Sequence, residues 1–139
     1  MKEDNLKIRF GPAGNSEKFY EDGHKSSLEA PKWIHDQGLN AFEYSFGRGI
    51  KLNEEMAVKL GQEAKKYDVA MSVHAPYYVN LATFETKKEE GNKKYIFDTF
   101  KMARLMGADR VTLHPGSCAK IDRKKAFLQN LSAFRDIFG

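Results

Sequence analysis

Bulky side chains alternate with small or polar ones in two short segments that end in the same way. These segments are 69–74 and 110–114, and alternation with a period of two predicts β-strands whose faces have different surroundings. Each segment places a histidine, His74 or His114, last on its less apolar face. A proline, which cannot donate to a sheet ladder, follows each histidine at once. The two histidines are therefore expected at matching strand ends, as two walls of one site.

The same reasoning predicts the other elements. Alternation indicates two further strands, and helical spacing of apolar residues indicates four helices. The strands are expected at 6–10 and 40–46, and the helices at 26–37, 53–67, 93–106 and 122–138. Ser26 and Glu29 have the spacing of a capping box, although Pro31 also fits the first turn of a helix that begins later. The segments 15–25 and 82–92 are interpreted as polar, irregular connections.

Strand and helix thus alternate four times, which predicts a parallel sheet with right-handed crossovers. One face of this sheet is bulky, and the other carries small, polar or charged residues such as Glu43 and Thr112. That asymmetry favours the lumen of a (βα)8 barrel over a doubly wound sheet, whose faces are both bulky. Such barrels contain about 250 residues. The 139-residue chain is therefore expected to be one α/β domain, residues 1–139, built as a parallel (βα)4 half-barrel with its helices on one face. A structural ion pair is expected between Arg9 and Glu43 on neighbouring strands.

Composition limits the surroundings in which the chain works. A net charge of +4 is compatible with a polyanionic partner but does not require one. No apolar run approaches membrane-spanning length, and no apolar signal segment follows Met1. The single cysteine, Cys118, excludes an internal disulfide. We therefore expect a cytoplasmic protein without a membrane partner.

Two stretches on the predicted strands carry a family pattern, SVHAPYYVNLA at 72–82 and VTLHPGS at 111–117. The segments IRFGPAG, EYSFGRG and MARLMGADR support it. The chain resembles the endonuclease IV family (AP endonuclease family 2), within the xylose-isomerase-like TIM barrels. The resemblance covers nearly the whole chain but only the first half of the family's barrel. It implies the amino-terminal half of a zinc-dependent DNA-repair enzyme that cleaves DNA 5′ to an apurinic or apyrimidinic (abasic) site.

The resemblance places His74 and His114 on two histidines that bind one zinc of the family's three-zinc cluster. Neutral imidazoles held at strand ends are good ligands for zinc and for some other divalent metals. The family's remaining ligands, including a bridging glutamate, come from later strands, so no complete catalytic set is expected here. The isolated chain is therefore expected to be inactive, and the resemblance leaves open whether it is an enzyme by itself.

The resemblance also assigns DNA contacts to loops at the strand ends. Arg48, Tyr77 and Tyr78 match an arginine and two bulky residues that family members insert into DNA at the abasic site. Asn80 matches a recurrent position that holds its loop through side-chain hydrogen bonds. From the residues alone, packing of the two tyrosines on neighbouring loops explains them about as well as binding does.

Three functions from different classes remain open. The chain is a repair nuclease or its amino-terminal half, or a sugar or sugar-phosphate isomerase or epimerase of the same superfamily, or a non-catalytic half-barrel. Fold alone does not separate them. The loop at 74–82 and the basic residues at 120–125 favour DNA. Free edges on the first and fourth predicted strands favour a protein partner, either a second copy in a homodimer or the missing carboxy-terminal half.

Overall fold

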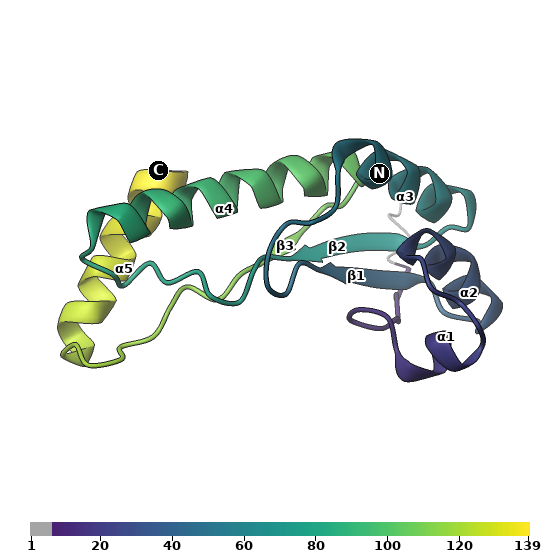
Figure 1. Cartoon of the computed structure of the whole chain (residues 1–139), viewed down its shortest axis with the longest axis horizontal. Coiled ribbons are helices and arrows are strands. Elements are labelled where there is room, and N and C mark those ends of the chain that lie inside the picture. Colours follow the sequence, from purple (N-terminus) through teal and green to yellow (C-terminus); the bar gives the residue numbers. More distant parts are fainter. Residues whose placement is uncertain (1–6) are drawn as a thin grey trace, which may run out of the picture.

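The computed structural model describes residues 7–139, which form an elongated α/β structure (Figure 1). Strands and short helices gather at one end, α4 runs along the length, and α5 crosses the far end. In chain order the elements are α1 (Glu17–Glu21), η1 (Ser27–Glu29), α2 (Ala30–Asp36), β1 (Ala41–Ser45), α3 (Glu54–Lys66), β2 (Ala70–His74), α4 (Thr86–Leu105), β3 (Val111–Thr112) and α5 (Arg123–Phe138).

The three strands form one parallel sheet in the order β1-β2-β3. Ala41 is aligned with Ala70 and Ser45 with His74, so β1 and β2 end at the same level. Helices α3 and α4 lie over the same face of the sheet, as the alternating pattern predicts (Figure 1). This is the parallel α/β arrangement of a partial TIM barrel.

The core lies between the bulky face of the sheet and helices α2, α3 and α4. Phe42, Leu60 and Val73 are at most 2% exposed, and Ala103 closes the layer from α4. Asn53 caps α3 by accepting a hydrogen bond from the Met56 amide, 2.9 Å away, as its position in the sequence predicts. The apolar side chains of β1 and β2 are therefore held in a complete sheet-and-helix layer.

The first predicted strand is not formed by the described residues 7–10, and Leu6 lies outside the described part. The pairing beside β1 is shifted to 10–14 instead. The Phe10 carbonyl accepts from the Ala41 amide at 3.1 Å, and the Gly14 amide donates to the Glu43 carbonyl at 2.8 Å. Pro12 has no amide proton, which prevents a regular ladder. A Cβ on Gly11 would lie only 1.5 Å from the Ala41 carbonyl oxygen, so this close approach of the two backbones requires glycine.

The ion pair predicted between Arg9 and Glu43 is wrong for the same reason. Arg9 Nη2 lies 3.0 Å from Asp68 Oδ1, and Nη1 donates to the Asp68 carbonyl at 2.7 Å. Glu43 instead accepts a long hydrogen bond, 3.4 Å, from the Thr112 hydroxyl across the sheet. Because 7–10 is not in the ladder, Arg9 reaches the turn before β2 and not the face that carries Glu43.

Two helical boundaries also differ from the sequence prediction. Helix α4 begins at Thr86 and not at Lys93, because the polar residues before Lys93 form a solvated helical surface, and Asn92 among them is buried. A short helix, α1, occupies part of the segment expected to be irregular, and it fully buries Phe19. The capping box of Ser26 is confirmed, but it heads the 3-10 turn η1, and α2 follows with Pro31 in its first turn.

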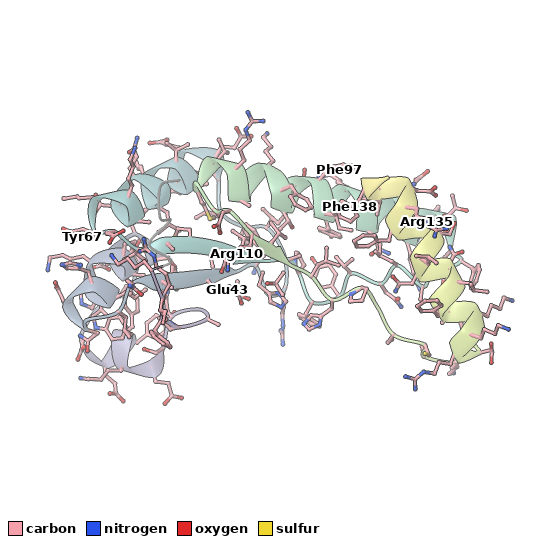
Figure 2. The ribbon with its side chains drawn as sticks, turned by 180° about the vertical axis from the view of Figure 1, so that it is seen from behind. Glu43, Tyr67, Phe97, Arg110, Arg135 and Phe138 are labelled. Atoms are coloured by element: carbon pink, nitrogen blue, oxygen red, sulfur yellow. The ribbon has the colours of Figure 1, made fainter. Side chains whose placement is uncertain are left out.

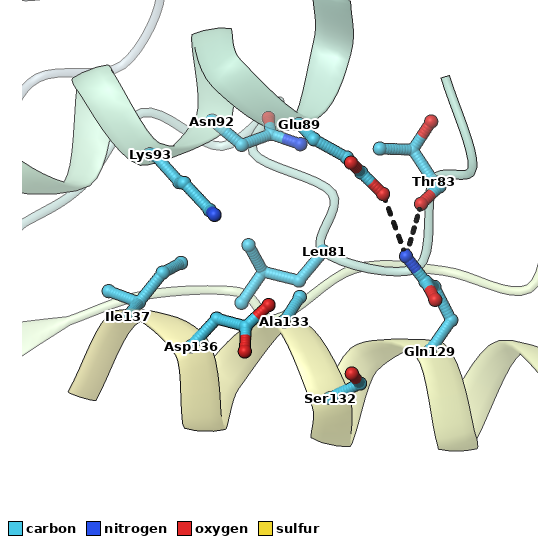
Figure 3. A pocket seen from close by; sticks show the side chains of 10 residues that line it. All are labelled: Leu81, Thr83, Glu89, Asn92, Lys93, Gln129, Ser132, Ala133, Asp136 and Ile137. Carbon is cyan, nitrogen blue, oxygen red and sulfur yellow. Dashed lines mark hydrogen bonds between the residues drawn. The ribbon is translucent and has the colours of Figure 1, made fainter. Parts of the chain in front are cut away.

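Helix α5 is attached to the rest of the chain by a few contacts near α4. Phe138 of α5 lies where this helix meets α4 (Figure 2), and its ring is 5.7 Å from that of Phe100. Gln129 donates to the Thr83 carbonyl at 2.9 Å and to Glu89 Oε1 at 2.8 Å, beside a cavity of about 40 Å³ (Figure 3). This cavity has room for water but not for a substrate.

The apolar residues at helical spacing that predict the last helix form a stripe that is largely open to solvent, made of Phe127, Leu131, Phe134 and Phe138. Phe127 is 64% exposed, and Phe134 and Phe138 are both above 40%. Within the described residues 7–139, no helix is long and apolar enough to cross a membrane.

Candidate metal and nucleic-acid site

The two histidines meet at the carboxyl ends of β2 and β3. His74 is aligned with Thr112, so His114 follows two positions further along the same face. Their ring centroids are 4.9 Å apart, with 49° between the ring planes. His74 is half-buried and His114 is exposed. The structure therefore brings together the pair that the sequence predicts, although β3 is only two residues long and ends before His114.

A backbone contact fixes how His74 can act. Its Nδ1 lies 2.7 Å from the carbonyl oxygen of Ala75. A carbonyl only accepts, so Nδ1 donates its proton, and in the neutral ring Nε2 then keeps its lone pair. This arrangement, in which one imidazole nitrogen donates to a carbonyl and the other is left to bind, is typical of histidines that ligate a metal.

The pair alone does not complete a metal site. Within residues 7–139 no group of three or more histidine, cysteine, aspartate or glutamate side chains is placed to hold a metal ion. Zinc sites with catalytic roles usually have three protein ligands and an open position. The donor chemistry therefore fits part of a zinc site, for which His74 and His114 supply two ligands.

Arg48, Tyr77 and Tyr78 gather beside the end of β2. The Tyr78 hydroxyl donates to the Arg48 carbonyl at 3.2 Å, and the Tyr77 amide donates to the Gly47 carbonyl at 3.3 Å. These bonds tie the loop after β1 to the loop after β2. The Arg48 side chain is exposed, so its cation remains available at the surface.

The two tyrosines differ in their surroundings. Tyr77 is 57% exposed and Tyr78 38%, and their rings meet edge to face at 5.6 Å. Tyr78 also packs edge to face on Tyr95 of α4 at 5.2 Å. Desolvation raises the pKa of the Tyr78 hydroxyl above that of a free tyrosine. Tyr78 is thus a neutral packing residue, and Tyr77 is the ring that remains largely free.

Asn80 has the loop-holding contacts that the sequence predicts. Its side-chain Oδ1 accepts from the Ala82 amide at 3.0 Å and from the Ser117 amide at 3.3 Å, which joins the loops after β2 and β3. Asn92 of α4 donates to the Asn80 carbonyl at 2.7 Å. The half-buried Asn80 therefore positions the loop, and its contact with DNA stays a prediction.

Two supporting residues were not found from the sequence. Asn92 lies in the segment interpreted as a solvated connection, and Gly116 was seen only as part of a loop. A Cβ on Gly116 would lie 2.1 Å from Asn80 Oδ1, and its φ of +142° disfavours other residues. The sequence contains two signals for these roles. Asn92 is an asparagine within a lysine-rich segment, and Gly116 is a glycine directly after a His-Pro pair.

Surface depressions flank this region. One, of about 460 Å³, is lined by Tyr78, Asn80 and Tyr95 among others, and another, of about 400 Å³, lies between the loop at 115–118 and α5. Neither lining includes a histidine. The histidine pair therefore faces the open side of the sheet and not an enclosed pocket for a small substrate.

Comparison with known proteins gives the family. The family model described as a xylose isomerase-like TIM barrel matches residues 31–138, which is most of the chain and includes both histidines. The chain belongs to the xylose isomerase-like TIM-barrel family. A relative named "Probable endonuclease 4", from Mycoplasmoides gallisepticum, is 37% identical over 60 residues, which are 43% of this chain and 20% of the relative.

Two solved structures show the same fold. Endonuclease IV from Thermus thermophilus matches 94% of this chain and 47% of its own, with a TM-score of 0.57 and 22% identity. D-Psicose 3-epimerase from Clostridium cellulolyticum matches 82% of this chain and 42% of its own, with a TM-score of 0.70 and 13% identity. The chain thus spans less than half the length of these barrels.

Proposed function

We propose that the chain is the amino-terminal part of an endonuclease IV-like, zinc-dependent enzyme that cleaves DNA at abasic sites, and that it is inactive without further barrel strands. The paired histidines at adjacent strand ends carry the proposal, because two imidazoles 4.9 Å apart are suited to one metal ion. The similarity to a probable endonuclease 4 supports it.

The roles of the residues follow from their positions. His74 and His114 would hold zinc, which, when bound, polarises a phosphate and lowers the pKa of a coordinated water. The Ala75 carbonyl keeps His74 in the tautomer that can bind a metal. Asn80 and Gly116 hold the two loops together around the pair. The further ligands would come from strands outside this chain.

DNA recognition would depend on Arg48 and Tyr77. Both side chains are exposed beside the histidine-bearing strand end, and the bond between Tyr78 and the Arg48 backbone sets their spacing. An exposed ring can stack where a base is missing, and a cation can contact the flanking phosphates.

Binding to matched duplexes tests this proposal. Tyr77→Ala should weaken binding to an abasic duplex about 10-fold, within the range for loss of one aromatic stacking contact. Binding to the same duplex without the lesion should change little. Tyr20→Ala is the matched control, because Tyr20 is 53% exposed on α1, away from the strand ends. Fluorescence anisotropy with labelled duplexes measures both affinities. Equal losses on the two duplexes would show that Tyr77 is a general contact, and the abasic-site proposal would fail.

A sugar or sugar-phosphate isomerase or epimerase is the second candidate. The TM-score of 0.70 with D-psicose 3-epimerase favours it, although at 13% identity this shows only the fold. Tyr77, which is 57% exposed beside the strand ends, favours nucleic acid over a sugar, since an exposed ring can stack on a base. A chain that binds ketohexoses in isothermal titration but shows no preference for abasic DNA would support this candidate instead.

A further inference from the structure

Four cations cluster where the chain enters α5. They are Lys120, Arg123, Lys124 and Lys125, called here the basic turn, and all four are exposed. Their number equals the whole net charge of the chain, +4. None of the ion pairs formed within residues 7–139 involves the basic turn.

Lysines on the other helices are arranged differently. Several of them pair with a carboxylate one helical turn away, which balances the charge of those surfaces. These pairs are Lys18 with Asp22, Lys32 with Asp36, Lys59 with Glu55, Lys88 with Glu85, and Lys94 with Asp98. The basic turn therefore differs from these lysine-bearing surfaces, because its four cations form no such pairs within the described residues.

Carboxylates near the basic turn are already engaged. Asp122 Oδ1 accepts from the Lys125 amide at 3.0 Å and so caps α5. Glu85 is paired with Lys88, and Glu89 accepts from Gln129. The first turn of α5 contains no acidic residue, and the helix dipole adds positive potential at this end. The free chain therefore carries a local excess of positive charge that destabilises the helix start.

Aromatic rings border the basic turn. Lys125 Nζ lies 5.2 Å from the centre of the Phe84 ring, and Phe84 is 49% exposed. Phe127, directly after the cations, is 64% exposed. The basic turn therefore lies on an open surface that the backbone of a duplex can reach.

We propose that the basic turn binds the phosphate backbone of double-stranded nucleic acid, at a distance from the histidine pair. This rests on the proposed function. The connection 115–122 has eight residues, which reach at most about 29 Å. A duplex gains one phosphate per strand for about every 3.4 Å. The contacts would therefore fall within about eight base pairs of a lesion placed at His74 and His114.

Salt dependence tests the proposal, because each neutralised phosphate contributes about 0.9 to the slope of log affinity against log salt. The probe is a fluorescent duplex without a lesion, titrated with the full chain between 50 and 250 mM KCl, roughly the range in which such slopes are measured. The triple variant R123Q/K124Q/K125Q should lower the slope by about 2.7. K32Q/K59Q/K94Q is the matched control, because it removes the same net charge from paired lysines on other helices. Its slope should equal that of the unsubstituted chain.

A second variant guards against a folding defect. Lys120→Gln lies before α5 and should lower the slope by about 0.9. The triple variant retains Asp122 and should melt at the same temperature as the unsubstituted chain or slightly higher, since it removes unfavourable charge from the helix start. Circular dichroism measures this melting.

Several results would overturn the proposal. These are an unchanged slope in both basic-turn variants, an equal drop in the control, or weaker binding to phosphatidylserine vesicles with unchanged binding to the duplex. Failure of the proposed function is separable. If the chain prefers abasic DNA but the basic-turn variants keep the salt slope of the unsubstituted chain, only the proposal for the basic turn is refuted. If the salt slope falls in these variants but the unsubstituted chain shows no preference for abasic DNA, only the endonuclease proposal is refuted.

Discussion

The two ends of this molecule are packed to very different degrees. Around β1 and β2, helices α2, α3 and α4 enclose a core in which Phe42, Leu60 and Val73 are almost completely buried. At the other end, α5 fully buries only Ala126 and leaves an apolar stripe exposed. The first region is a finished layer of sheet and helices, whereas few of residues 7–139 cover the apolar stripe of α5. A complete barrel packs a neighbouring strand and helix against such a helix.

The length of the relatives agrees with this difference. The chain spans 47% of endonuclease IV from Thermus thermophilus and 42% of the epimerase. A half-barrel can thus build a core from its first strands, because each parallel strand is covered by its own crossover helix. Its last helix has no such cover. A protein partner would therefore pack mainly against α5 and β3. This holds for a second copy and for a carboxy-terminal half.

The largest difference between the two regions is expected when a core side chain and a stripe side chain are truncated. Phe42→Ala should cost about 3–5 kcal/mol of unfolding free energy, because it removes a ring buried in a packed core. Phe127→Ala on α5 should change it by less than about 0.5 kcal/mol. Urea unfolding followed by Trp33 fluorescence measures both. A loss at Phe127 as large as that at Phe42 would mean that α5 is packed in solution.

A smaller effect is expected at the junction between the two regions. Gly116→Ala forces a Cβ to within 2.1 Å of Asn80 Oδ1 at a φ of +142°, and it should cost about 1–3 kcal/mol. Gly91→Ala is the matched control. Nothing lies within 4 Å of a Cβ added there, inside α4, so the substitution should stabilise the chain by about 0.5–1 kcal/mol. Thermal unfolding of the two variants should therefore shift in opposite directions, and a shift in the same direction would contradict the loop geometry.

The smallest effect on stability is expected at the histidines. The double variant His74→Ala/His114→Ala should unfold within about 0.5 kcal/mol of the unsubstituted chain, since neither ring is buried in the core. Zinc measured by elemental analysis should bind weakly to the unsubstituted chain, be removed by a mild chelator, and be lost in the double variant. His35→Ala, an exposed histidine on α2, should bind zinc like the unsubstituted chain. Zinc that survives both chelation and the double substitution would place the metal site elsewhere.

Local patterns predicted the strands that the core depends on. Alternation located β1 and β2, and Asn53 and Ser26 marked helix starts that the structure confirms. The pairing of His74 with His114 also followed, because parallel strands of equal design end at one edge of a sheet.

Features that depend on distant contacts could not be predicted. Arg9 bonds to Asp68 because Gly11 and Pro12 shift the pairing beside β1 by several residues. Helix α4 begins early in a run of polar residues, whose helical face is recognisable only once Asn92 is seen to bond Asn80. The role of Gly116 depends on a side chain from another loop, which no local pattern contains.

The covered edge of β1 limits how copies of this chain can assemble. Segment 10–14 occupies that edge, and Pro12 offers no amide for pairing, so within residues 7–139 the ladder is left open only at β3. A sheet with two free edges can add molecules without end and form a fibre, whereas a sheet with one can join a single neighbour. The two-residue length of β3 makes even that union short. Assembly of residues 7–139 through strand edges would therefore stop at two molecules, which opposes polymerisation along the sheet.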